Sequence, residues 1–319
     1  MTVRWGILST ARINDKFLAG VAHTDGALVS AVASRDFDRA RSYATEHGIE
    51  RAYGGYDDLL TDPEIEAVYI SLPNSLHLEW TDRAIRADKH VLCEKPLSTD
   101  PDAVNAAFDL ADQRGLVLME AFMYRHNPQT LRVQELVRDG AVGRLRLIRA
   151  SFSFVASDPS NIRLATGLDG GALMDVGSYC VNTARMLAGE PLSVTAQQIL
   201  GGDGVDVVFT GTMSFAGGVL TGFDCGLALA ARDELEVVGD RGSLFLDDPW
   251  HCLSPVIELR RDGDVELIEL PRVDSYMLEA ENMAAAIRGV AEPLLGRADA
   301  VGQATTLQAL YDAARAASG

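Results

Sequence analysis

The chain has 319 residues, 47% of them hydrophobic, which is enough for a sizeable core and for two domains. Its formal net charge of -18 argues against a nucleic-acid partner, because no basic face is available for a phosphate backbone. The four cysteines have no C-x-x-C spacing and fit reduced thiols, and no apolar run approaches membrane-spanning length. We therefore expect a cytoplasmic protein that binds neither a membrane nor nucleic acid.

The first third of the chain alternates strand and helix patterns. Short apolar runs of strand length lie at residues 3–8, 28–33, 67–72 and 116–119, and another lies within residues 89–97. Helical patterns separate them at residues 11–22, 39–47, 76–87 and 102–114. Repeated βα units with short connections predict an N-terminal Rossmann-like domain over residues 1–121, with a doubly wound parallel sheet.

The pattern changes after Phe122. Alternating strand patterns occupy residues 145–154, 205–215, 219–229, 234–238, 243–246 and 256–259, several joined by glycine-bearing turns. Helical patterns lie at residues 129–138, 173–187, 276–288 and 301–317. We predict a second α/β domain over residues 122–319, with a large and mostly antiparallel sheet.

One buried strand of the first domain ends in a charged pair, Glu94 and Lys95, followed by Pro96. The carboxyl edge of an open parallel sheet is where such folds bind ligands. The proline removes a backbone donor and restricts Lys95, which favours an aimed lysine over an ordinary surface ion pair.

The turn after the first strand lacks the glycines of a dinucleotide fingerprint. Laying G-x-G-x-x-G on it places Ser9, Ala11 and Asn14 at the three glycine positions. Small residues and the hydroxyls of Ser9 and Thr10 remain, and these could donate to phosphate oxygens. The alternative is an ordinary strand-to-helix turn capped by Ser9 or Thr10.

The end of the second strand predicts the cofactor type. NAD-binding domains usually place an acid there, whereas this chain has Ser34 and Arg35, which can bind and neutralise a 2′-phosphate. The prediction is NADP. Alternatively Ser34 caps the next helix and Arg35 is solvent-exposed, and Asp36 and Arg39 leave use of NAD open.

Four ordered motifs resemble the Gfo/Idh/MocA oxidoreductases, especially the dihydrodiol dehydrogenase and D-xylose dehydrogenase group. They are W-G-I-L-S-T-A-R-I at residues 5–13, P-N-S-L-H at 73–77, C-E-K-P-L at 93–97 and G-G-A-L-M-D-V-G-S-Y at 170–179. The resemblance covers essentially the whole chain. It implies a Rossmann domain followed by an open-faced α/β domain, whose sheet often forms the interface of a homodimer or higher homo-oligomer, with NADP as a common cofactor.

The resemblance also implies catalytic roles. Lys95 matches a lysine near the nicotinamide that hydrogen-bonds the reacting oxygen, while Asp175 and Tyr179 match a D-x-x-x-H pattern with tyrosine in place of histidine. Tyr179 would be the acid/base, and a nearby Lys95 ammonium would favour its phenolate in the oxidative direction. Seen alone, Asp175 and Tyr179 would be a helix first-turn acid and a half-buried aromatic residue.

The resemblance assigns cofactor contacts as well. These fall on Ser9, Thr10, Ala11, Arg12, Ile13, Ser34, Arg35, Leu72, Pro73, Asn74, His77, Glu94, Lys95 and Arg163. A surface salt bridge for Arg163 and helix packing for His77 are the alternatives. No metal is expected, since the six histidines lack zinc-ligand spacing. Phe152, Phe154 and Tyr276 could line the substrate, although their periodicity favours core positions.

These observations predict an NADP-dependent oxidoreductase acting on a secondary alcohol or hemiacetal carbon of a sugar or cyclic diol. Two alternatives remain open: a keto-sugar reductase working in the opposite direction, and a non-catalytic NADP-sensing regulator of the same fold. Intact Lys95, Asp175 and Tyr179 argue against the regulator.

Overall fold

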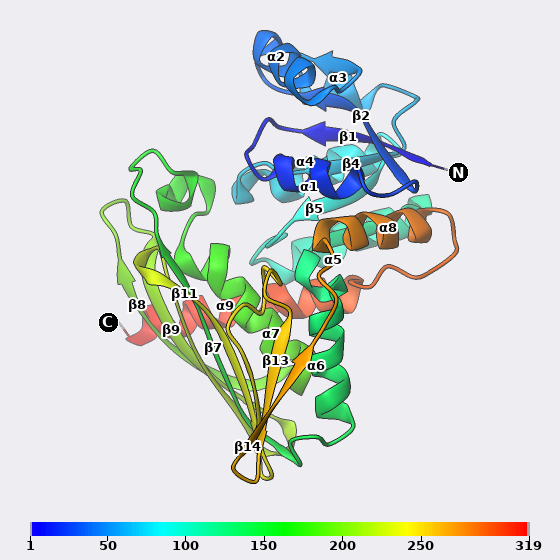
Figure 1. Cartoon of the computed structure of the whole chain (residues 1–319). Coiled ribbons are helices and arrows are strands. Elements are labelled where there is room, and N and C mark those ends of the chain that lie inside the picture. The colour runs from blue at the N-terminus through cyan, green and yellow to red at the C-terminus, as the bar shows by residue number, and fades with distance from the viewer. Residues whose placement is uncertain (1, 318–319) are drawn as a thin grey trace. The chain divides into compact units, whose positions relative to one another are not determined.

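The structure, a computed structural model, describes residues 2–317 and divides into two compact units (Figure 1). One unit comprises the residues up to Met123 together with Asp274–Val301, and the other comprises Tyr124–Val273 together with the residues from Gly302 onward. No helix within residues 2–317 is long and apolar enough to cross a membrane.

The sheet of the N-terminal unit is parallel, as predicted. Its described strands are β1 (Val3–Leu8), β2 (Ala27–Ala33), β3 (Arg51–Tyr53), β4 (Ala67–Ile70), β5 (His90–Glu94) and β6 (Leu118–Ala121). They run in the order β3-β2-β1-β4-β5-β6, so the winding reverses between β1 and β4. Ligands of doubly wound sheets bind at the carboxyl ends of the strands near this reversal.

The helices of this unit are α1 (Asn14–Val21), α2 (Phe37–His47), α3 (Tyr56–Leu60), α4 (His77–Arg86), α5 (Pro101–Arg114) and α8 (Ser275–Ile287). The helix predicted at residues 276–288 is α8, and it packs on α1. Gly20 makes this approach feasible, because a Cβ there would lie 2.6 Å from the backbone nitrogen of Met277. Any side chain at position 20 would therefore push α8 away from α1.

The second unit is built on a larger, mostly antiparallel sheet (Figure 1). In the described part of the chain its order is β14-β13-β12-β11-β7-β10-β9-β8, and β7 and β10 form its parallel pair. The strands are β7 (Leu145–Val155), β8 (Pro191–Leu200), β9 (Asp206–Phe215), β10 (Val219–Gly226), β11 (Ala228–Gly239), β12 (Ser243–Leu246), β13 (Val256–Arg261) and β14 (Asp264–Glu269). Its longer helices are α6 (Pro128–Arg138), α7 (Ser178–Ala188) and the part of α9 (Arg297–Ala317) that begins at Gly302. The fold class predicted from the sequence is therefore confirmed.

Among the α-helices and strands given above, four short or exposed ones were not predicted. They are β3, α3, β8 and β14. Strands β8 and β14 are the two edges of the large sheet, and most of their residues are half-buried or exposed. A strand whose two faces are both largely exposed has no regular alternation of apolar and polar residues, so the sequence does not reveal it.

A buried histidine at the start of the second unit should make stability depend on pH. His126 is 7% exposed, and its Nε2 has no hydrogen-bond partner within residues 2–317. Burial, with the nearby Arg125 charge, lowers the pKa of His126 to about 3. The unfolded chain, with a histidine pKa of about 6.5, takes up this proton first as the pH falls. We expect His126 to cost about 2 kcal/mol of unfolding free energy between pH 7.5 and pH 5.

Denaturant unfolding of wild type and His126→Leu across this pH range measures the effect. Asp206, whose pKa is raised by burial to about 6, changes the free energy of unfolding with pH in the opposite direction. Wild type and His126→Leu both contain Asp206, so the difference between their pH slopes isolates His126. The exposed His23, changed to leucine, is the control and should keep the wild-type slope. Equal pH slopes for wild type and His126→Leu would contradict the prediction.

Candidate functional site

Lys95 stands on a braced segment at the carboxyl end of β5. The Tyr69 hydroxyl of β4 donates to Glu94 Oε1 at 2.5 Å, and the Leu97 backbone N–H donates to Glu120 Oε1 at 2.7 Å. Lys95 itself is half-buried. Because the backbone on both sides of Lys95 is held by neighbouring strands, the lysine is well placed to present its ammonium at a defined position.

His77 also holds the segment around Lys95 in place. Its Nδ1 lies 2.8 Å from the Pro96 carbonyl oxygen and its Nε2 lies 2.8 Å from that of Leu72. The residue is 1% exposed, and burial lowers the pKa of its imidazole although the two carbonyls oppose this shift. Both ring nitrogens face backbone carbonyls, so His77 joins the turns after β4 and β5, and its contact with a cofactor stays a prediction.

The glycine-free turn after β1 is tied to the turn after β4. Ser9 adopts a φ of 137°, a conformation that favours glycine, which explains why a fingerprint places glycine here. Its Oγ lies 2.7 Å from Ser71 Oγ and accepts the Ala11 N–H at 3.1 Å. Ser9 is 8% exposed and its hydroxyl holds the two turns together, so its contact with a phosphate stays a prediction.

The N-terminus of α1 can still receive a phosphate. Within residues 2–317 no side-chain hydrogen bond caps the first residue of α1, although Ser9 Oγ accepts the Ala11 N–H in the turn before it, as in the alternative of a turn capped by Ser9. Thr10, Ala11 and Ile13 are half-buried and Arg12 is exposed in the turn that leads into the helix. Backbone N–H groups at an uncapped helix start suit a pyrophosphate, so this turn fits a dinucleotide without glycines.

The end of β2 fits a 2′-phosphate. Ser34 is 7% exposed and its Oγ accepts the Asp36 N–H at 3.4 Å, while Arg35 is exposed. Asp36, not Ser34, caps α2, and its carboxylate accepts the Arg39 N–H at 3.0 Å. The carboxylate of Asp36 therefore caps α2, and the exposed guanidinium of Arg35 is its neighbour in the chain.

In the second unit, Asp175 and Tyr179 lie on consecutive turns where a π-helical segment, Leu173–Gly177, leads into α7. A Cβ at Gly177 would come within 2.7 Å of the Cys225 sulfur, so the glycine allows this segment to lie close against β10. Single π turns inside helices are frequent at functional sites because they re-aim side chains.

Asp175 is held by the arginine that was predicted to approach the cofactor. Arg163 Nε donates to Asp175 Oδ2 at 2.6 Å, with 13% of the Asp175 side chain and 43% of the Arg163 side chain exposed. In this structure the Arg163 guanidinium therefore belongs with Asp175. A mostly buried carboxylate paired in this way is a suitable orienting group beside an acid/base residue.

Tyr179 is 7% exposed and surrounded by aromatic rings. Its ring centroid lies 5.5 Å from that of Phe152, 5.6 Å from that of Tyr124 and 6.2 Å from that of Trp250. Phe152 is thus both a core residue and a neighbour of Tyr179, whereas Phe154 is half-buried farther along β7 and Tyr276 is buried in α8 of the other unit. This apolar surrounding limits the freedom of the phenol ring.

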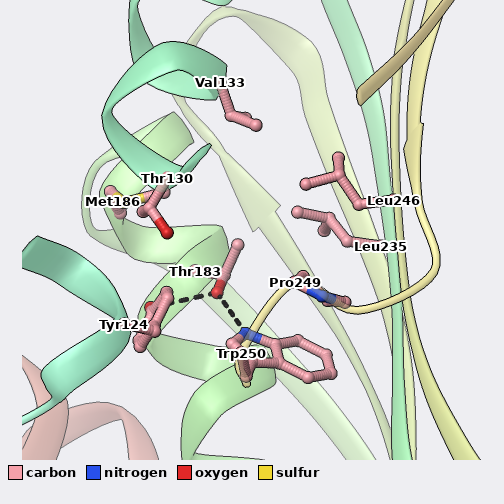
Figure 2. Close-up of a pocket in the computed structure, with 9 residues that line it drawn as sticks. All are labelled: Tyr124, Thr130, Val133, Thr183, Met186, Leu235, Leu246, Pro249 and Trp250. Carbon is pink, nitrogen blue, oxygen red and sulfur yellow. Dashed lines mark hydrogen bonds between the residues drawn. The ribbon is translucent and has the colours of Figure 1, made fainter. Parts of the chain in front are cut away.

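Trp250, which the sequence did not single out, anchors a loop to α7 one turn beyond Tyr179. Figure 2 shows its Nε1 and the Tyr124 hydroxyl both directed at Thr183 Oγ1, at 3.0 Å in each case. The rings of Tyr124 and Trp250 line a narrow pocket. Its other lining residues are Thr130, Val133, Thr183, Met186, Leu235, Leu246 and Pro249. The only sequence signal for Trp250 is an aromatic residue in the D-D-P-W-H stretch between two strands.

The two halves of the chain match two family models. Residues 3–122 match the oxidoreductase family with an NAD-binding Rossmann fold, and residues 130–245 match the GFO/IDH/MocA C-terminal domain. D-xylose 1-dehydrogenase (NADP(+)) 2 of Haloferax volcanii is 36% identical, over 97% of this chain and 97% of that protein. Trans-1,2-dihydrobenzene-1,2-diol dehydrogenase of Danio rerio is 33% identical, over 80% of this chain and 77% of that protein.

A solved structure is similar over the whole length. KijD10, a 3-ketoreductase from Actinomadura kijaniata in complex with NADP and TDP-benzene, superposes with a TM-score of 0.91 at 31% identity, covering 98% of each chain. Both the predicted family and the predicted arrangement of a Rossmann unit followed by an antiparallel sheet unit are thus confirmed.

Proposed function

Because the chain belongs to the Gfo/Idh/MocA oxidoreductase family, we propose that it oxidises a secondary alcohol or hemiacetal carbon of a sugar or cyclic diol with NADP. The observation that carries this proposal is the phenol of Tyr179, held in an aromatic surrounding beside the Asp175–Arg163 pair. The braced Lys95 supports it from the other unit. Relatives with the same overall fold act on sugars and on dihydrodiols.

When bound, NADP⁺ accepts the two electrons and the hydrogen that leave the carbinol carbon. Tyr179 in its phenolate form takes the hydroxyl proton, and the phenol so formed, which holds a proton up to about pH 10, can return that proton in the reductive direction. Lys95 places a positive charge at the oxygen where negative charge develops. Asp175, fixed by Arg163, orients the helix turn that carries Tyr179.

The preference for NADP is tested at Arg35. An exposed guanidinium that binds a 2′-phosphate contributes about 1.5–3 kcal/mol, so Arg35→Ala should raise KM for NADP about 10- to 100-fold. KM for NAD, which has no 2′-phosphate, should stay within about twofold. Initial rates with each cofactor measure the shift.

Arg41→Ala is the matched control, because Arg41 is an exposed guanidinium of α2, the helix that follows Arg35, and pairs with Asp38. It should leave both KM values unchanged. An equal rise for NAD and NADP in Arg35→Ala would contradict a 2′-phosphate contact. A wild-type protein that prefers NAD would contradict the cofactor assignment itself.

The reverse reaction, reduction of a keto-sugar, has its own support in the similarity to a 3-ketoreductase. Absorbance of the reduced nicotinamide distinguishes oxidation of the alcohol from reduction of the keto-sugar. Purified protein is mixed with NADP⁺ and a panel of aldoses, inositols and cyclic diols, and separately with NADPH and ketones of the same sugars. Turnover only with the ketones would favour the reductase. Bound NADP with no turnover in either direction would leave the cofactor-sensing regulator.

We further propose that the protein works as a homodimer or higher homo-oligomer through its large sheet. Large apolar side chains stay exposed on strands of this sheet: Leu192, Ile199, Leu200, Leu220, Val265 and Leu267. Such side chains on a sheet favour burial against a second copy.

A further inference from the structure

The helix that carries Tyr179 begins against a carboxylate from a distant strand. Asp206, the first residue of β9, is 2% exposed, and its Oδ2 accepts the Leu173 N–H at 2.7 Å. The backbone of Ala172 also stabilises this carboxylate by a hydrogen bond. Ala172 and Leu173 are the first residues of the helix, so their N–H groups have no partner within the helix itself. A buried carboxylate therefore caps the helix that leads to Asp175 and Tyr179.

Tyr311 of α9 completes this cap. Its hydroxyl donates to Asp206 Oδ1 at 2.9 Å and also interacts with the backbone of Met174. The two side chains leave no space at Gly171, where a Cβ would collide with Asp206 Oδ1 and lie 3.1 Å from the Tyr311 oxygen. Gly171 also has a φ of 124°, a conformation that favours glycine. Asp206 and Tyr311 thus explain the second glycine of the G-G-A-L-M-D stretch.

The other end of the same segment is held by α9 as well. Gln303 Nε2 donates to the Ser178 carbonyl oxygen at 2.9 Å. The π-helical turn Leu173–Gly177 therefore lies between two fixed points, the Asp206 carboxylate at its start and Gln303 at its end. A π turn is rare, and such local geometry persists only where the surrounding contacts hold it. Release of its start would let the turn relax and change the direction of Tyr179.

Asp206 is a carboxylate that titrates near pH 6. Burial raises its pKa to about 6, although its hydrogen bonds oppose this shift. Burial, with Asp206 among the nearby charges, also raises the pKa of Tyr311 and of Cys225 in β10, so both stay protonated at this pH. Asp175 pairs with Arg163, and the neighbouring strand β8 has no titratable side chain. Below about pH 6 the Asp206 carboxyl carries a proton, and one of its two acceptor oxygens becomes a donor.

We propose that Asp206 and Tyr311 are positioning residues for Tyr179: the ionised carboxylate and the hydroxyl fix the start of its helix, and full turnover requires both. This inference rests on the proposed function and concerns the control of the same site. An ionised carboxylate with a raised pKa lowers the stability of the fold at neutral pH. Its retention follows if both acceptor oxygens are needed, because a protonated carboxyl or an amide would set a donor against the Leu173 N–H or the Tyr311 hydroxyl.

Asp206→Asn keeps the size of the side chain and removes one acceptor. It is expected to lower kcat about 10- to 100-fold, the effect of a misplaced catalytic group, with KM for NADPH within about twofold of wild type. The thermal melting temperature should not fall, because the substitution removes a buried charge. Rates are measured with NADPH and whichever keto-sugar of the panel turns over.

The pH profile of kcat separates positioning from a merely structural role. In the reductive direction Tyr179 donates as a phenol, which ordinarily holds its proton up to about pH 10, so its own titration does not shape the acidic limb of the profile. The wild-type kcat should fall as the pH falls through about 6, and Asp206→Asn should lack this limb. Tyr311→Phe removes a hydrogen bond that lowers the pKa of Asp206, so it should move the limb to higher pH.

Hydrogen exchange followed by mass spectrometry tests the same contact without a substrate. The peptide over residues 171–178 should exchange about 5- to 10-fold faster in Asp206→Asn than in wild type at neutral pH, the effect of losing one hydrogen bond. Asp240→Asn is the matched control, because Asp240 is an exposed carboxylate of the same unit that accepts the Arg144 N–H at 2.9 Å. It should change neither this exchange nor kcat.

A kcat of Asp206→Asn within about threefold of wild type, or an acidic limb that survives in this variant, would overturn the proposal. So would unchanged exchange over residues 171–178, or a melting temperature that falls together with kcat, which would show a structural role alone. If the wild type turns over no substrate in either direction, the proposed function is refuted. The exchange rate in Asp206→Asn then decides by itself whether Asp206 holds the start of this helix.

Discussion

Replacing Lys95 with alanine is expected to lower kcat by about 10²- to 10³-fold, the usual effect of removing a group that stabilises a developing oxyanion. The cost falls on the transition state, because the positive charge is needed most when the substrate oxygen loses its proton. The variant should fold, since hydrogen bonds of Tyr69, Glu120 and His77 hold the segment around residue 95. Single-turnover absorbance at the nicotinamide band measures the loss.

The sequence offers unusually clean controls for this prediction, because it contains only three lysines. Lys89 is 6% exposed and its Nζ donates to the carbonyls of Asp62 and Ile65, whereas Lys16 is exposed on α1. Lys16→Ala should keep wild-type activity. Amine acylation followed by peptide mass spectrometry should modify Lys16 with or without NADP, but modify Lys95 more slowly when NADP is bound. A Lys95→Ala enzyme with kcat within tenfold of wild type would contradict the oxyanion role.

The regular parts of the fold could be predicted because burial leaves a periodic trace. Strand β5 is apolar on both faces, and α5 begins with an Asp100 cap and ends at Gly115 in the left-handed conformation. No such sequence pattern indicates that α8, which follows the second unit in the chain, packs in the N-terminal unit. This packing depends on Gly20, more than 250 positions away in the chain, whose missing side chain lets the two helices touch.

The candidate site likewise has features that the sequence predicts and features that it does not. Motifs singled out Lys95, Asp175 and Tyr179 as candidates because their residue types and order are unusual. They did not show that the Ser9 hydroxyl is consumed by Ser71, or that Arg163 pairs with Asp175, because a hydrogen bond between distant segments has no local signature. Trp250 was missed for the same reason: a loop carries no periodicity, and its hydrogen bond with Thr183 forms only when the loop packs against α7.

Replacing Tyr179 with phenylalanine is expected to reduce kcat by about 10²- to 10⁴-fold in both directions, the range lost when a general acid or base is removed. The change deletes a single oxygen and keeps the ring that packs against Phe152, Tyr124 and Trp250. The thermal melting temperature should therefore stay close to that of wild type. Binding of NADPH, followed by fluorescence, should be unaltered, because the phenol is assigned to the substrate proton and not to the cofactor.

Tyr43→Phe is the control for this last change, since it removes a hydroxyl that contacts Asp15 at the surface of the other unit. It should leave kcat and KM unchanged. If Tyr179→Phe retains more than a tenth of wild-type kcat, the proton must leave through another group, and Asp175 becomes the candidate to test by Asp175→Asn. If Tyr179→Phe and Lys95→Ala each lose activity but the double variant loses no more than either alone, the two groups act on the same proton transfer. That non-additivity is what a shared substrate oxygen requires, because a phenol and an ammonium that serve one oxygen cannot fail independently.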